Sequence, residues 1–177
     1  MDLGLKDARV FVAASSTGLG AATARRFSLE GAEVVVNGRH QDSLERTAEG
    51  IQRESGNNVI ALMGDLTDAD AVASIVENAV ARLGGLDILV TNAGGPPSGR
   101  FESVALEDWE AAFQLNVMSA VRLIHAALPY LKQSARAAIL TITSVSIKQP
   151  IENLILSNSV RMAVAGLTKS LADELGP

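Results

Sequence analysis

A short loop with two glycines stands between an apolar run and an alanine-rich helical segment near the start of the chain. The loop residues are Ala14, Ser15, Ser16, Thr17, Gly18, Leu19 and Gly20. Glycine lets a backbone approach a ligand closely, and the unpaired amides that open a helix attract anions. The pattern therefore predicts that the diphosphate of a dinucleotide rests on the amides at Gly18 and Gly20, with an ordinary tight turn as the alternative. Ala14 stands where such loops usually carry their first glycine.

The next apolar run ends at Asn37, which lies 23 residues after Ala14. An acidic residue here would bind the ribose hydroxyls of NAD and would repel a 2′-phosphate. Asn37 is neutral, and Arg39 can pair with a phosphate group. These residues predict NADP as the cofactor, with NAD less favoured; the alternative is that Arg39 is only a solvated turn residue.

Further polar groups stand where later apolar runs end, or inside an apolar helical stripe. Asp65 and Leu66 follow the third run, and Asp65 can either meet a ligand or cap the next helix. Asn116 lies among apolar residues at helical spacing, where an amide must find partners or reduce stability. A hydrogen-bonded structural amide is the alternative for Asn116. Ser144 ends the fifth run and either faces a ligand or caps the next segment.

A framework that brings strand ends together must position these side chains. Five short, β-branched runs predict strands covered on both faces: Ala8–Ala14, Glu33–Val36, Asn58–Leu62, Leu86–Val90 and Ala137–Ile142. Apolar residues at helical spacing predict helices over Val72–Leu83, about Leu106–Leu131 and Val160–Leu175. Helical crossovers between strands produce a parallel sheet with helices on both faces. The fold class is therefore α/β, a Rossmann-type doubly wound sheet in three α/β/α layers, with strand order 3-2-1-4-5.

Composition excludes several classes of protein. The 177 residues fit one domain, and 47% hydrophobic with 20% charged residues is typical of a globular chain. The formal charge of -5 argues against nucleic acid or an anionic membrane as partner. The absence of cysteine is compatible with the cytoplasm, and no metal-ligand spacing occurs. The amino terminus has no signal-peptide pattern, and no stretch of about 18 apolar residues predicts a membrane span.

Together, the glycine loop, the motif Thr91-Asn92-Ala93-Gly94, Asn116 and Ser144 resemble the short-chain dehydrogenase/reductase family over essentially the whole chain. The resemblance implies that Asp65 and Leu66 contact adenine, and that Asn92, Ala93 and Gly94 brace the sheet beside the cofactor. It also implies that Asn116 helps to organise a proton relay and that Ser144 orients the substrate.

The chain departs from this family at the proton donor. The family has a tyrosine about 13 residues beyond the serine and a lysine four residues later, and this chain has Ser157 and Arg161 at those positions. The only tyrosine, Tyr130, lies on an earlier helix, where we expect it to pack. A serine hydroxyl is far less acidic than a phenol, and loss of a general acid costs about 10²–10⁴ in rate. Arg161 keeps the positive charge but cannot deliver a proton. The alternative for both residues is an ordinary polar helix face.

The leading hypothesis is an NADP-dependent oxidoreductase similar to 3-oxoacyl-carrier-protein reductases. It would move hydride between nicotinamide and a small-molecule carbonyl or alcohol, with Asn116, Ser144, Ser157 and Arg161 in the catalytic site. The second hypothesis is a non-catalytic dinucleotide-binding or redox-sensing protein that has lost the acid. The third is an assembly subunit.

The resemblance also bears on assembly and on length. It implies a homodimer or homotetramer formed through the helices that contain Trp109 and Val160. The family normally continues past the position of Pro177 with further strands and a substrate-covering loop. We therefore expect a single dinucleotide-binding domain over residues 1–177 that is shortened at its C-terminus, with one edge of the sheet uncovered.

Overall fold

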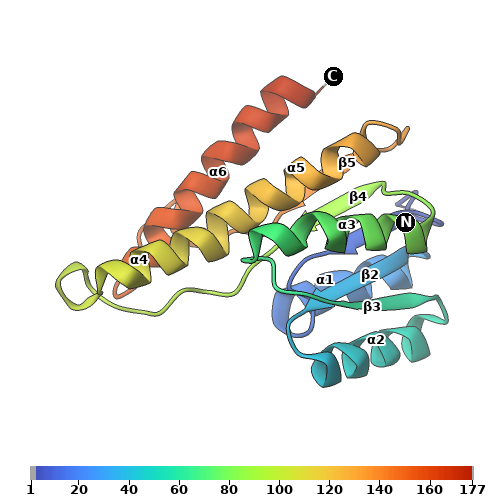
Figure 1. Ribbon diagram of the computed structural model, residues 1–177, viewed down its shortest axis with the longest axis horizontal. Helices are drawn as coiled ribbons and strands as arrows, with labels where there is room; N and C mark the ends of the chain where they lie inside the picture. Colours follow the sequence, from blue (N-terminus) through green and yellow to red (C-terminus); the bar gives the residue numbers. More distant parts are fainter. Residues whose placement is uncertain (1–2, 177) are drawn as a thin grey trace.

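Five parallel strands form one sheet, in the order β3-β2-β1-β4-β5, in the computed structural model, which describes residues 3–176 (Figure 1). The strands are β1 (Arg9–Val12), β2 (Glu33–Gly38), β3 (Val59–Met63), β4 (Ile88–Thr91) and β5 (Ala138–Thr141). The α-helices are α1 (Gly18–Leu29), α2 (Gln41–Ser55), α3 (Ala69–Leu83), α4 (Leu106–Phe113), α5 (Ser119–Leu131) and α6 (Ile155–Leu175). The predicted fold class and strand order are confirmed.

The central strand β1 pairs with β2 on one side and with β4 on the other. Val12 lies opposite Val36 of β2 and Val90 of β4, and all three side chains are completely buried. A strand with helices on both of its faces has no solvent side, so apolar residues can occupy successive positions. The unalternating runs in the sequence arise from this double cover.

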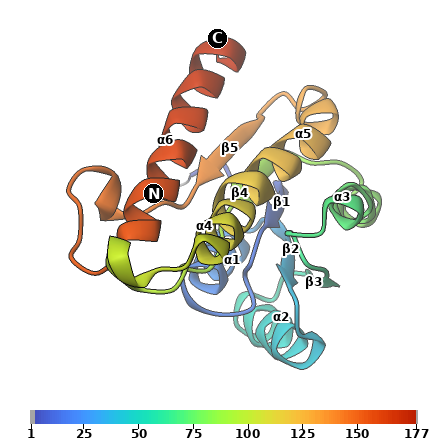
Figure 2. The ribbon, with the colours of Figure 1, turned by 60° about the vertical axis from the view of Figure 1, so that its left-hand side comes forward.

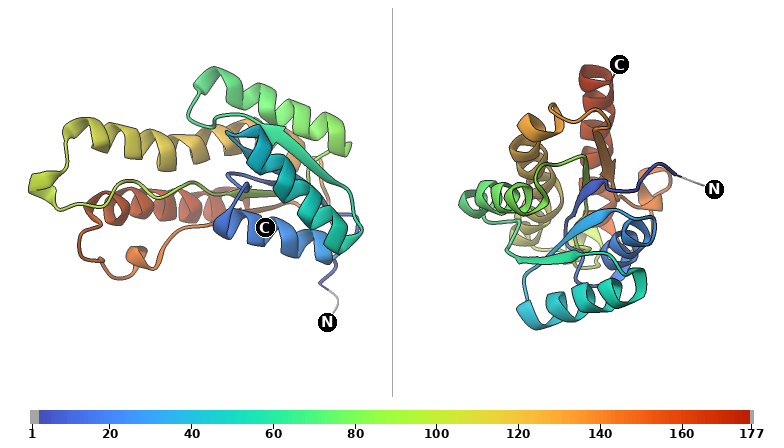
Figure 3. Two further views of the ribbon diagram at one scale, coloured as in Figure 1. Left: turned by 90° about the horizontal axis from the view of Figure 1, so that it is seen from below. Right: turned by 90° about the vertical axis from the view of Figure 1, so that its right-hand side faces the viewer.

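Helices cover both faces of the sheet, as the right-hand view of Figure 3 shows. On one face, Ala24 of α1 and Leu44 of α2 pack into one apolar cluster. On the other face, Val76 of α3 and Leu123 of α5 pack against Phe11 of β1. The long helix α6 lies beside β5 and extends past the sheet (Figure 2). These layers leave one edge of the sheet, where the parallel strands end, to the connecting loops.

The helix predicted over about Leu106–Leu131 is interrupted by a π-helical turn. This turn, Gln114–Met118, lies between α4 and α5, and it buries Asn116 and Val117 together. Hydrophobic periodicity does not reveal a single inserted residue, so the sequence predicts one regular helix. By length and composition, Leu106–Leu131 is also the one candidate membrane span among the described residues, a test that the core helix of a globular protein passes too.

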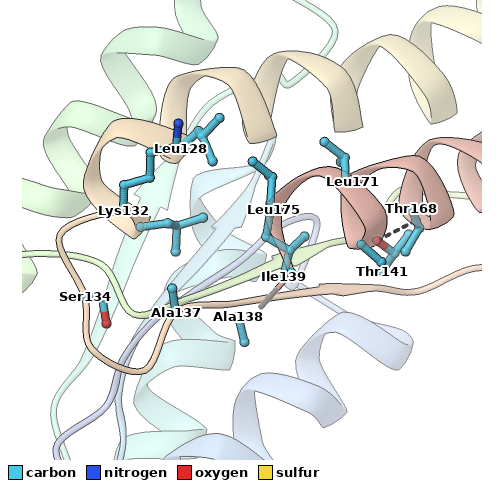
Figure 4. A pocket seen from close by; sticks show the side chains of 13 residues that line it. Leu128, Lys132, Ser134, Ala137, Ala138, Ile139, Thr141, Thr168, Leu171 and Leu175 are labelled. Atoms are coloured by element: carbon cyan, nitrogen blue, oxygen red, sulfur yellow. Dashed lines mark hydrogen bonds between the residues drawn. The ribbon is translucent and has the colours of Figure 1, made fainter.

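The outer strand β5 pairs with β4 alone within residues 3–176. Its Leu140 side chain is 46% exposed, although the inner strands are almost fully buried. An apolar groove of about 330 Å³ lies between β5, α5 and α6, and Figure 4 shows Leu128, Ile139 and Leu171 in its walls. The free sheet edge expected from the sequence is therefore at β5.

Candidate functional site

The loops that follow the strands line a cleft of about 390 Å³ at the carboxyl edge of the sheet. This volume lies within the usual range of small-molecule sites, and the position is the one at which α/β sheets bind ligands. Most of the predicted cofactor-binding residues line the cleft: Ala14, Ser16, Thr17, Asn37, Arg39, Asp65, Leu66, Asn92, Ala93 and Gly94. The other four belong to the first loop and lie beside or beneath this lining: Ser15, Gly18, Leu19 and Gly20.

Ser15 joins the ends of β1 and β2 beneath the cleft. Its side chain is completely buried, and its hydroxyl donates a hydrogen bond to the Val12 carbonyl oxygen at 2.7 Å. The same hydroxyl accepts a hydrogen bond from the backbone amide of Asn37 at 2.9 Å. The Ser15 side chain therefore shapes the loop from below, because both of its hydrogen bonds are internal.

The first helix opens with free amides beside the cleft. Within residues 3–176 the backbone amides of Gly18, Leu19 and Gly20 donate no hydrogen bond, and Thr17 provides no side-chain cap. No acidic residue stands in the first turn to offset the positive end of the helix dipole. Gly18 has φ +59°, a conformation that favours glycine, and Ala14 adopts φ +45° at the position where such loops usually carry one. The arrangement fits a bound diphosphate, because an anion would satisfy these amides.

Asn37 lines the cleft, but its side-chain amide is hydrogen-bonded to backbone atoms of the protein. The Nδ2 atom donates to the carbonyl oxygens of Leu62 and Gly64, at 3.1 and 3.2 Å, and the residue is 1% exposed. These bonds tie the end of β2 to the end of β3. Arg39, in contrast, is exposed at the rim of the cleft and lies in none of the ion pairs among the described residues. Of the two, Arg39 is the residue with a side chain free to meet a ligand.

Asp65 forms a local turn at the same end of the cleft. Its Oδ1 atom accepts hydrogen bonds from the amide and the hydroxyl of Thr67, at 2.9 and 2.8 Å. The bond from the Thr67 amide, helped by the Thr67 hydroxyl and the nearby charge of Arg39, lowers the pKa of the Asp65 carboxyl. The cap of α3 is Asp68, which accepts from two amides of the first turn. Asp65 is therefore an ionised rim residue and not the helix cap.

Asn92 connects the end of β4 to the first loop. Its Nδ2 atom donates to the carbonyl oxygens of Ala13 and Ala14, at 3.3 and 3.1 Å. Through these bonds the loop after β1 and the loop after β4 form one continuous wall of the cleft. The bracing role that the resemblance implies for this motif beside a cofactor stays a prediction.

Asn116 lies in the π-helical turn and is 4% exposed. Its Nδ2 atom donates to the Ala112 carbonyl at 3.2 Å, but its buried Oδ1 atom has no partner among the described residues. A small cavity of about 10 Å³, close to the size of one water molecule, is lined by Asn116, Ser119 and Arg161 among others. The Nδ2 atom of Asn116 therefore has a structural hydrogen bond, whereas its Oδ1 atom is available to accept a further one.

Ser144 and Ser157 stand on either side of the segment between β5 and α6, and neither residue is in the lining of the cleft or of the small cavity. Ser144 is half-buried, and its hydroxyl accepts a hydrogen bond from the Ser146 amide at 3.1 Å, which caps the short turn Val145–Ile147. Ser157 lies in the first turn of α6 and is 7% exposed. Burial of Ser157 argues against an ordinary polar helix face, whereas Ser144 does serve as a cap.

Arg161 reaches from α6 to the ends of two strands. Its Nη1 atom lies 3.4 and 3.5 Å from the carbonyl oxygens of Ile142 and Thr143, and Nη2 lies 3.5 Å from that of Ala93. The side chain is half-buried, and burial lowers the pKa of its guanidinium. The loops after β4 and β5 therefore meet around a positive charge.

The sequence interpretation missed several residues that line the cleft. Gly38 is the last residue of β2 and His40 comes two residues later, and the rule that ligands meet the carboxyl ends of strands could have identified both. Leu115 and Ser119 also line it, from the π-helical turn and the start of α5. No local pattern marks these two residues, because only the packing of the helix on the sheet brings them to the cleft.

The chain matches the family model for short chain dehydrogenases over residues 8–177. It is 36% identical over 173 residues to the uncharacterised oxidoreductase YvrD of Bacillus subtilis, which covers 98% of this chain and 65% of that protein. The chain thus spans slightly less than two thirds of the length of this relative.

Solved structures share the fold closely. L-sorbose reductase from Gluconobacter frateurii, in complex with NADPH and L-sorbose, has a TM-score of 0.94 and 31% identity, over 99% of this chain and 66% of that chain. An NADPH-bound short chain oxidoreductase from Pseudomonas aeruginosa PAO1, described as containing an atypical catalytic center, has a TM-score of 0.91 and 30% identity. That match covers 97% of this chain and 68% of the Pseudomonas chain.

Proposed function

The chain belongs to the short-chain dehydrogenase family, and from that premise we propose that it binds NADPH in the strand-end cleft as part of an oxidoreductase. The observation that carries this proposal is the set of free amides at Gly18, Leu19 and Gly20, which open α1 beside a cleft of about 390 Å³. Two structural relatives that hold NADPH support the choice of dinucleotide.

The lining of the cleft has two chemically different ends. Arg39 and Asp65 stand at one end, where they would hold the adenosine half and its 2′-phosphate. Asn92, Ala93 and Gly94 stand at the other end, where the nicotinamide half would lie. The first loop, between these two ends, would hold the diphosphate. Position 37 carries a neutral asparagine and not an acidic residue, and the guanidinium of Arg39 forms no ion pair among the described residues. Both features favour NADP over NAD.

The proposed reaction interconverts a carbonyl and an alcohol, as in 3-oxoacyl-carrier-protein reductases. When bound, the nicotinamide supplies the hydride that reduces the carbonyl carbon. Ser144 and Ser157 would orient the substrate oxygen through their hydroxyls, and the charge of Arg161 would stabilise negative charge on that oxygen. The hydroxyl of Ser157 can pass on a proton from water, although it is a poor acid by itself.

The first test is the effect of Arg39→Gln on dinucleotide affinity. We expect the Kd for NADPH to rise about tenfold, because a charge-assisted hydrogen bond to the 2′-phosphate is lost, and the Kd for NADH to stay unchanged. The measurement is a fluorescence titration with each dinucleotide. Arg53→Gln, on the exposed last turn of α2, is the matched control. An equal loss of affinity for both dinucleotides would show that Arg39 does not contact the 2′-phosphate, and no binding of either by the unaltered protein would refute the proposed function.

The second test concerns turnover. A dinucleotide-binding protein without catalysis is the alternative function, and the pair Ser157 and Arg161 is the feature that favours it. We expect slow or absent reduction of a 3-oxoacyl thioester, and a gain of about 10²-fold in the variant Ser157→Tyr/Arg161→Lys, which would restore a phenol beside a cation. Rates are followed by NADPH absorbance, with each single variant as control. A double variant that binds NADPH yet is no faster would show that these positions do not form the proton-donating site.

A further inference from the structure

Arg161 is a half-buried cation without a counter-charge. None of the five ion pairs among the described residues includes it, and its neighbours within hydrogen-bond distance are three backbone carbonyl oxygens, at 3.4 to 3.5 Å. Removal of a charge from water is costly unless an opposite charge offsets it. Carbonyl dipoles at these distances offset the charge of Arg161 only in part. The remaining positive charge therefore attracts or repels the charged groups of any ligand bound beside it.

Within residues 3–176, no carboxylate forms an ion pair with Arg161 or lines the small cavity beside it. The small cavity that it lines with Asn116 and Ser119 contains no Asp or Glu among its lining residues. Ser157, one helical turn earlier, has a hydroxyl that stays neutral over the pH range of proteins. Among the described residues, Asp65 is the one acidic residue in the lining of the cleft, and it stands with Arg39 at the opposite end.

Arg161 lies beside one end of the cleft. Asn92, Ala93 and Ser119 line both the cleft and the small cavity beside Arg161, and the Nη2 atom lies 3.5 Å from the Ala93 carbonyl oxygen. In the orientation of the proposed function, on which this inference rests, this is the nicotinamide end. The uncompensated charge of Arg161 is thus next to the expected position of the nicotinamide ring, which is the part that differs between the two redox forms of the dinucleotide.

We propose that Arg161 makes the cleft select the reduced dinucleotide over the oxidised one. NADP⁺ carries a positive charge on its nicotinamide ring, whereas the ring of NADPH is neutral and the remainder of the molecule is the same. A fixed cation repels the first ring and leaves the second unaffected. Repulsion between two unit charges in a partly solvated site is equivalent to about a tenfold change in a dissociation constant. At equal concentrations of the two forms, the cleft would then hold mostly NADPH.

The test compares dissociation constants for NADPH and NADP⁺, measured by isothermal titration calorimetry without any substrate. We expect the ratio Kd(NADP⁺)/Kd(NADPH) to fall about tenfold in Arg161→Met, because the repulsion is removed. Arg161→Lys keeps the charge and should keep the ratio. Arg39→Gln is the matched control: it should weaken both ligands by one common factor, because both carry the same 2′-phosphate.

Each outcome separates this inference from the proposed function. If Arg161→Met binds both forms with the ratio of the unaltered protein, the inference is wrong and the proposed function stands. If the unaltered protein binds neither form, the proposed function fails. Circular dichroism establishes that each variant is folded, and Arg161→Gln, which retains a polar side chain, serves if the methionine variant does not fold. A fall in the ratio for Arg161→Lys as large as for Arg161→Met would also overturn the inference, since the effect would then follow side-chain shape and not charge.

Discussion

Gly20→Ala is expected to lower the free energy of unfolding by about 3 kcal/mol and to abolish dinucleotide binding. A Cβ atom at this position would lie 2.5 Å from the Ala14 carbonyl oxygen and 2.8 Å from both Asn92 Nδ2 and Ser15 Cα. Two of these three atoms belong to the backbone, so the clash cannot be relieved by turning a side chain. The first loop and α1 would have to separate, and the free amides would leave the cleft. Urea denaturation and an NADPH titration measure the two effects.

Gly18→Ala is the matched control in the same loop. A Cβ atom there would meet no other atom within 4 Å, so the only cost is the conformation with φ +59°. We expect a loss of about 1 kcal/mol in stability, from that backbone strain alone. If Gly20→Ala proved as mild as Gly18→Ala, the close approach of α1 to the strand ends would not be required by the fold.

The second large effect is expected at Asp87, at the opposite edge of the sheet from the cleft. The Asp87 side chain is 3% exposed. Arg9 donates to it from Nε to Oδ2 at 3.0 Å and from Nη2 to Oδ1 at 2.6 Å. The Arg9 amide and the Ser134 hydroxyl also donate to it, and Arg136 Nε lies 3.5 Å away. This cluster joins β1, the start of β4 and the loop before β5, so one carboxylate holds three segments of the framework.

Asp87→Asn is expected to cost about 3 kcal/mol in the free energy of unfolding. One carboxylate oxygen becomes an amide donor that faces other donors, and the guanidinium of Arg9 loses the charge that offsets it. Chemical denaturation at neutral pH measures the change. Glu54→Gln, in the exposed Arg25–Glu54 pair, is the control, and we expect no resolvable shift in its unfolding midpoint.

The same variant changes how stability depends on pH. The hydrogen bonds of the Arg9 guanidinium, followed by those of the Arg9 amide and Ser134, outweigh burial and hold the pKa of the Asp87 carboxyl well below its usual range. A carboxyl with a lowered pKa in the folded state stabilises the protein fully above its unfolded pKa, near 4, and loses this contribution as the pH falls toward the folded value. We therefore expect the free energy of unfolding, measured between pH 7 and 2, to fall less steeply below about pH 4 in Asp87→Asn than in the unaltered protein. An equally steep decline in both proteins would exclude Asp87 as the source of the acid sensitivity.

Much of the framework could be predicted from the sequence. Runs such as Glu33–Val36 carry β-branched residues at every position except the first, which is typical of strands buried on both faces. The crossover rule then allowed the strand order and the common edge of the strand ends to be inferred, and the structure confirms the order. The π-helical turn around Asn116 could not be predicted, because one inserted residue hardly changes the apolar periodicity of a helix.

The fold class and the family could be inferred from the sequence alone, as could the set of chemical groups available, which includes Ser157 and Arg161. Which of those groups have a side chain available for a ligand depends on their contacts in the folded chain. Asn37 is consumed by bonds to two carbonyl oxygens from the β3 end, whereas Asn116 retains a buried oxygen without a partner. The physical reason is that hydrogen-bond partners and counter-charges come from segments distant in sequence, so whether Arg161 is neutralised depends on how the helices and strand ends meet.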